Sequence, residues 1–63
     1  MNPTRYDLKN NADFFYAVYC GKTVYYVSAS RIGCGRTDLY TDDYVVIDGE
    51  YFSRKDCEFF VDA

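Results

Sequence analysis

Eight tyrosines and five phenylalanines stand in a chain of 63 residues that contains no tryptophan and no histidine. A chain of this length buries only about 60% of the surface that its unfolded state exposes, so its single core must be small. So many rings cannot all fit inside such a core, and several tyrosines must therefore lie at the surface. Exposed tyrosines are frequent anchors of protein interfaces, whereas the absence of histidine removes the commonest general base and metal ligand.

The three cysteines, Cys20, Cys34 and Cys57, are an odd number and lack the close spacing of a zinc motif. We therefore expect free thiols in a reducing compartment, no bound metal and no cofactor. A nucleophilic role for Cys34, in its glycine-flanked loop, would need a base that the sequence does not supply. Because no targeting segment or membrane-spanning apolar run is evident, the sequence predicts a cytoplasmic protein. With no base to activate a nucleophile and no match to a P-loop, a Rossmann fingerprint or an EF-hand, we expect a protein that is not an enzyme.

Aromatic and β-branched residues dominate two runs, 14–20 and 23–28, which are separated by Gly21 and Lys22. This composition predicts two β-strands, and a glycine at the first central position suits a two-residue type II′ turn. The core face of this hairpin would carry Phe14, Tyr16, Val18, Tyr25 and Val27. The reverse face would carry Phe15, Ala17, Tyr19, Val24, Tyr26 and Ser28. Because the reverse face is nearly as apolar, we expect it to be covered by another element or offered to a partner.

A second hairpin is predicted over 44–53, where Asp48 and Gly49 suit the positive φ angles of a type I′ turn. Between the two hairpins, the polar residues 31–43 predict a long loop with at most a short strand around Leu39-Tyr40. The expected cross-strand pairs of the second hairpin are Ile47 with Glu50 and Val45 with Phe52.

After the second hairpin, Ser53 resembles a helix N-cap with an acid three residues later. We therefore expect a C-terminal helix over 54–61, and a final strand over 57–61 is the alternative. The predicted fold is a single α+β domain over 1–63. It comprises a small antiparallel sheet of three to five strands, built from two β-hairpins, with the C-terminal helix packed on one face.

Five acids and no lysine or arginine lie between Asp38 and Ser53, although the whole chain has ten acids and seven bases. Such an acidic, tyrosine-bearing segment repels nucleic acid and attracts basic protein surfaces. We predict that it contacts a basic site on a partner protein, with the tyrosines as anchors and the acids for steering and register. The candidate partner-binding residues are Tyr40, Asp42, Asp43, Tyr44, Asp48, Glu50 and Tyr51, together with Tyr19 and Tyr26 from the first hairpin.

In size, acidity and aromatic content, the chain resembles the small inhibitor proteins of bacteriophages, which include anti-CRISPR and other host-takeover proteins. The resemblance implies a stoichiometric blocker of a host protein complex in the host cytoplasm, without catalytic residues. The acidic segment suggests that the blocked surface is basic and handles nucleic acid. The alternatives are a small subunit that self-associates as a homodimer through the second apolar face of the first hairpin, a single-stranded nucleic-acid binder that uses exposed tyrosines, and a redox or metal module based on the cysteines.

Overall fold

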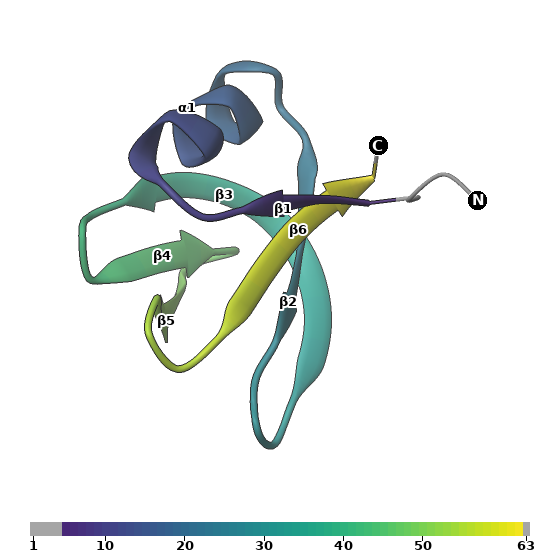
Figure 1. Cartoon of the computed structure of the whole chain (residues 1–63), viewed down its shortest axis with the longest axis vertical. Helices are drawn as coiled ribbons and strands as arrows, with labels where there is room; N and C mark the ends of the chain where they lie inside the picture. Colours follow the sequence, from purple (N-terminus) through teal and green to yellow (C-terminus); the bar gives the residue numbers. More distant parts are fainter. Residues whose placement is uncertain (1–4, 63) are drawn as a thin grey trace.

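The computed structural model describes residues 5–62. Along the chain these residues form β1 (Arg5–Leu8), α1 (Asn11–Tyr19), β2 (Thr23–Val27), β3 (Ile32–Tyr40), β4 (Tyr44–Ile47), β5 (Glu50–Ser53) and β6 (Glu58–Asp62). All paired strands are antiparallel, in the order β1-β6-β2-β3-β4-β5. The sheet is strongly curved and α1 lies over one end of it (Figure 1). The expected α+β fold with a C-terminal helix is therefore wrong: the described chain is mostly sheet, and its one short helix follows β1.

The nine-residue strand β3 belongs to both halves of the sheet. Its first part pairs with β2 and its last part pairs with β4, and the register shifts between Thr37 and Leu39. An irregularity of this kind bends a strand, and Figure 1 shows β3 curving from below α1 to its hairpin with β2. The bend brings the two halves face to face, so that the rings of Tyr26 on β2 and Phe52 on β5 lie 4.1 Å apart between centroids.

The core lies between the two halves of the sheet and is closed by α1. Phe14 of α1 is only 1% exposed. Its ring meets Phe59 edge-on, with the centroids 5.6 Å apart, and lies 5.9 Å from the ring of Tyr40. The guanidinium carbon of Arg54 sits 4.5 Å from the centre of the same ring. Phe14 therefore joins α1 to both halves of the sheet.

The run 14–20, which the sequence predicts as a strand, is helical, and the reason begins at Asn10. The Asn10 side chain accepts a hydrogen bond from the Asp13 amide at 3.0 Å, and the Asp13 carboxylate accepts one from the Asn10 amide at 3.2 Å. This capping box satisfies the first amides of α1. With Phe14 and Ala17 buried on one side, the cap and the packing outweigh the β-propensity of the aromatic residues.

Gly21 ends the helix instead of turning a hairpin. Its φ angle is 64°, in the left-handed region that glycine adopts without a steric penalty. The amide of Gly21 donates to the carbonyl of Val18 at 3.1 Å, and the amide of Lys22 donates to that of Ala17 at 2.9 Å. These two bonds form a Schellman motif, which is a common helix terminus.

The carboxylate of Asp13 makes the start of α1 sensitive to pH. A hydrogen bond from the Lys9 amide, at 2.8 Å, lowers the pKa of Asp13 below its ordinary value of 3.8. Because folding depresses this pKa, ionised Asp13 stabilises the fold above about pH 4, and the contribution is lost as the pH falls further. We expect Asp13→Asn to have a lower Tm than wild type at pH 7, and the difference in Tm between the two proteins to be smaller at pH 3. Thermal unfolding followed by circular dichroism measures both. A gap as wide at pH 3 as at pH 7 would contradict this, and Asp38→Asn is the control.

Because residues 14–20 do not form a strand, the buried and outer faces of β2 are the reverse of those predicted. Val24 and Tyr26 are buried, whereas Tyr25 and Val27 lie on the outer face and are only partly covered. The predicted faces depended on a pairing with residues 14–20, but the neighbours of β2 are β3 and β6. The expectation that Tyr26 faces outward is therefore wrong.

Most of the predicted loop 31–43 is the long strand β3. Glycines weaken the strand signal, but here they admit bulky neighbours: a Cβ atom on Gly33 would lie 2.4 Å from the Tyr26 hydroxyl oxygen, and one on Gly35 would lie 2.3 Å from a carboxylate oxygen of Asp48. The short strand expected around Leu39-Tyr40 is the end of this longer one.

The C-terminal segment is a strand, as the alternative interpretation held, and the expected helix over 54–61 is wrong. Strand β6 inserts between β1 and β2 and pairs with both. Phe59 and Val61 are buried, and Phe60 between them lies on the outer face, so burial follows the two-residue period of a strand. The second hairpin is confirmed, including the positive φ angles of Asp48 and Gly49 and the pairing of Ile47 with Glu50 and Val45 with Phe52.

Candidate functional site

Two of the predicted tyrosines meet on the outer face of β4 and β5. Tyr44 is 49% exposed and Tyr51 is 67% exposed, and their rings contact edge-on with centroids 6.2 Å apart. Val46 lies between them on the same face and pairs with Tyr51 on one side and with Leu39 of β3 on the other. We call Leu39, Tyr44, Val46 and Tyr51 the β4–β5 surface. It is an apolar patch on a rigid hairpin.

Asp42 and Asp43 lie beside the β4–β5 surface in the turn that precedes β4. The hydroxyl of Thr41 accepts hydrogen bonds from the amides of Asp43 at 3.2 Å and Tyr44 at 3.0 Å, which holds this turn. Asp42 also accepts a bond from the Asn11 side chain at 2.9 Å. Among residues 5–62, neither carboxylate is within ion-pair distance of a base, so both keep their charge available at the surface.

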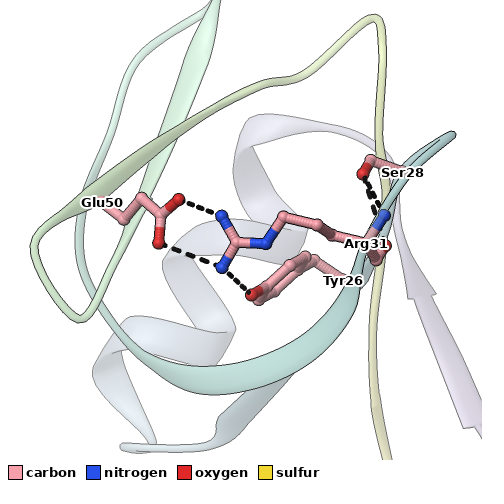
Figure 2. Close-up of polar contacts among 4 residues, drawn as sticks. All are labelled: Tyr26, Ser28, Arg31 and Glu50. Atoms are coloured by element: carbon pink, nitrogen blue, oxygen red, sulfur yellow. Dashed lines mark hydrogen bonds and ion pairs between the residues drawn. The ribbon is translucent and has the colours of Figure 1, made fainter.

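The other predicted acids have internal partners. Asp48 occupies the left-handed turn, and its carboxylate accepts a bond from the Arg36 amide at 3.2 Å. Glu50 forms a two-pronged ion pair with Arg31 (Figure 2). Because Arg31 comes from the turn between β2 and β3, this ion pair links that turn to β5. Asp48 and Glu50 therefore hold the hairpin in place, and the acidic segment does not form one continuous negative surface.

The remaining predicted tyrosines are scattered. Tyr26 is buried at 6% exposure, and its hydroxyl accepts a bond from Arg31 at 3.1 Å (Figure 2). Tyr40 is half-buried against Phe14. Tyr19 is 80% exposed, but on α1. The structure thus brings together Asp42, Asp43, Tyr44 and Tyr51, places Tyr26 in the core, and sets Tyr19 on a different element.

A second aromatic patch was not predicted as one surface. On α1, Phe15 and Tyr19 are one helical turn apart, and their rings stack with centroids 5.8 Å apart. Tyr16 of the same helix lies 6.3 Å from Tyr6 of β1 between ring centroids. These four residues, Tyr6, Phe15, Tyr16 and Tyr19, form what we call the helix surface. Phe15 and Tyr19 lie on the second apolar face predicted for the run 14–20, but that face was assigned to a sheet. Tyr16 was predicted on the core face, and Tyr6 lies outside the run.

The aromatic rings on the outer face of β2 and β6 are candidates for stacking on nucleobases. The rings of Tyr25 and Phe60 are nearly parallel, at 12°, with centroids 5.3 Å apart. The guanidinium of Arg5 covers the other face of Phe60 at 4.3 Å from its centre. Base stacking needs free ring faces together with cations for the phosphates. Here the rings face each other and Arg5, and Arg5 is already paired with Asp7 and Glu58.

A cavity of about 580 Å³ lies between the end of β1, the start of α1 and the β5–β6 connection. Leu8, Phe14 and Phe59 supply its apolar lining and Cys57 one thiol. Burial raises the pKa of Cys57, which keeps this thiol protonated rather than nucleophilic. Arg54, at the same place, donates to the Asn11 side chain at 2.6 Å and so fastens α1 to the connection. The other residues that line the cavity are charged: Asp7, Lys9, Asp42, Arg54, Lys55 and Glu58.

The candidate cysteine Cys34 lies in strand β3, not in a flexible loop, and its side chain is exposed opposite Tyr25. Within the described residues 5–62, no three potential ligands come close enough to hold a metal ion. No helix in that range has the length and apolar character needed to cross a membrane. When the chain was compared with known proteins, no family model, curated protein or solved structure matched it.

Proposed function

We propose that the protein is a non-enzymatic binding module that uses the β4–β5 surface to contact a basic site on a partner protein. The observation that carries this proposal is the pairing of Tyr44 and Tyr51 on one hairpin, next to the carboxylates of Asp42 and Asp43, which form no ion pair with a base among residues 5–62. Tyrosines with an apolar body and a polar tip are typical interface anchors. Nearby acids steer a basic partner and fix its register.

The partner that fits this surface best is a protein that handles nucleic acid, because such proteins carry basic grooves. Occupation of that groove would make the module an inhibitor of the kind found in bacteriophages. Three cysteines without disulfide bonds are compatible with a reducing compartment, and we place the protein in the cytoplasm.

The test is capture of partners from a bacterial lysate by tagged protein, with two matched double variants. Tyr44→Ser/Tyr51→Ser removes the rings of the β4–β5 surface, and Phe15→Ser/Tyr19→Ser removes two exposed rings of the helix surface. We expect the first variant to weaken partner binding about 30-fold or more, because the loss of one hot-spot aromatic residue worth about 2 kcal/mol would already have that effect. The second variant should bind like wild type, and added heparin or DNA should compete.

A second candidate function is self-association through the helix surface. It is favoured by the four exposed aromatic side chains of α1 and β1, which contact one another in pairs and form an apolar patch. If Phe15→Ser/Tyr19→Ser abolishes capture while Tyr44→Ser/Tyr51→Ser has no effect, the β4–β5 surface is not the binding site. Sedimentation equilibrium of both variants then decides between a helix-mediated homodimer and a different partner.

A further inference from the structure

Strand β5 is an edge of the sheet, because β4 is its only neighbour among the described strands. Alternate residues of a strand direct their amide and carbonyl groups to opposite sides. The amide of Arg54 donates to the carbonyl of Asp43 at 2.8 Å, and the carbonyl of Tyr44 on β4 accepts from Thr41 on the other side at 2.8 Å. Together with the register of β4 and β5, these bonds fix which residues of β5 point toward β4.

Glu50 and Phe52 direct their backbone groups toward β4, so Tyr51 and Ser53 direct theirs away from the sheet. The carbonyl of Ser53 accepts a bond from the Asp56 amide at 3.3 Å. Within residues 5–62, the amide and carbonyl of Tyr51 and the amide of Ser53 have no such partner. These three groups lie along an edge whose alternate residues are about 7 Å apart, which is the repeat of an added strand.

We propose that a basic segment of a partner protein binds this edge in an extended conformation and adds a strand to the sheet beside β5. The inference rests on the proposed function and specifies its binding mode. The segment would bond to the Tyr51 amide and carbonyl and to the Ser53 amide, as in other cases of strand addition. Its alternate side chains would lie on the β4–β5 surface, next to the rings of Tyr44 and Tyr51.

The charges around the edge favour a basic occupant. Asp42, Asp43, Tyr44, Ser53 and Lys55 line a depression of about 210 Å³ at the Ser53 end of β5. Two carboxylates outnumber one ammonium group there, and the exposed rings of Tyr44 and Tyr51 also attract cations.

The first experiment measures amide hydrogen exchange by NMR on the ¹⁵N-labelled protein. The probe is a peptide blocked at both ends, Lys-Thr-Val-Thr-Val-Thr-Lys, and the control peptide has Glu in place of both Lys. In the free protein we expect fast exchange at Tyr51 and Ser53 and slow exchange at Glu50 and Phe52. The lysine peptide should slow exchange at Tyr51 and Ser53 by about tenfold or more, because exchange requires the new hydrogen bond to open. The glutamate peptide should not.

The second experiment removes one hydrogen-bond donor from the edge. Ser53→Pro deletes an amide that points away from the sheet, and proline is tolerated at such positions. We expect it to weaken binding of the lysine peptide by two- to tenfold, which is the value of one hydrogen bond. Ser53→Ala, which keeps the amide, should bind like wild type. Exchange in the wild-type protein tests the proposal even if the proline variant does not fold.

The outcomes separate this inference from the proposed function. If the lysine peptide shifts the ring signals of Tyr44 and Tyr51 but leaves amide exchange at Tyr51 unchanged, the surface binds without strand addition and the inference is overturned. If exchange at Tyr51 slows with increasing protein concentration alone and the mass doubles, the occupant is a second copy and the basic segment is rejected. If the proline variant binds as well as Ser53→Ala, the edge amide has no role.

Discussion

Phe14→Ala is expected to remove a large part of the protein's stability. The side chain is 1% exposed and contacts the rings of Tyr40 and Phe59. Its removal should cost about 3–5 kcal/mol, the usual cost for a buried phenylalanine. A domain of this length has roughly 3–9 kcal/mol of stability in total. The loss also deprives the Arg54 guanidinium of the ring on which it rests.

Urea unfolding followed by circular dichroism measures this effect, and the next residue supplies a matched control. Phe15 is 59% exposed, so Phe15→Ala should change the free energy of unfolding by less than about 1 kcal/mol. If Phe14→Ala unfolds with a midpoint close to that of Phe15→Ala, then Phe14 does not hold α1 to the sheet as described here.

Gly33→Ala is expected to destabilise the fold by about 1–3 kcal/mol, the range for overpacked sites. An added Cβ would lie 2.4 Å from the hydroxyl oxygen of Tyr26 and 2.6 Å from the ring carbon that carries it. The Tyr26 ring cannot withdraw without cost, because Phe52 packs on it and Arg31 bonds to its hydroxyl (Figure 2). The added methyl group must therefore disturb the contact between the two halves of the sheet.

Chemical denaturation of two further variants isolates the cause. Cys34→Ala changes the neighbouring, exposed position of β3 and should be nearly neutral. Tyr26→Leu removes the hydroxyl and the ring carbon that the new Cβ would meet. If the clash is the cause, Gly33→Ala should cost less in the Tyr26→Leu background than in wild type, so that the two effects are not additive. Strict additivity would argue against it.

The parts of the fold that depend on residues close together in the sequence were predictable, and the second hairpin is the clearest case. Asp48-Gly49 specifies a turn with positive φ angles, and the turn alone sets the register of β4 and β5. Residues close together in the sequence also specify the helix near the other end of the chain. Asn10 and Asp13 have the spacing of a capping box, and reading them together with Gly21 would have indicated a helix instead of a hairpin.

The misassigned segments depend on contacts between distant parts of the chain. The sequence of β6 suits either a helix or a strand, and its pairing with β1 and β2 decides the matter. In the sequence, Gly33 argues against a strand, and only the structure shows that a glycine stands there because the ring of Tyr26 packs against it. In the candidate site, Tyr44 and Tyr51 were predictable because they share a hairpin. The role of Glu50 was not, because its partner Arg31 lies in another turn.

The position of β6 in the sheet has a consequence for how quickly the chain folds. Arg5 on β1 pairs with Asp62 on β6, and β6 also pairs with β2, so this end of the sheet is completed by contacts between segments far apart in sequence. Folds dominated by such pairings form in roughly milliseconds to seconds, because long loops must close before their contacts add stability. Until β6 inserts, β1 and β2 present open edges that invite pairing with other chains. The time that β6 takes to insert therefore adds to the time for which these open edges are exposed to aggregation.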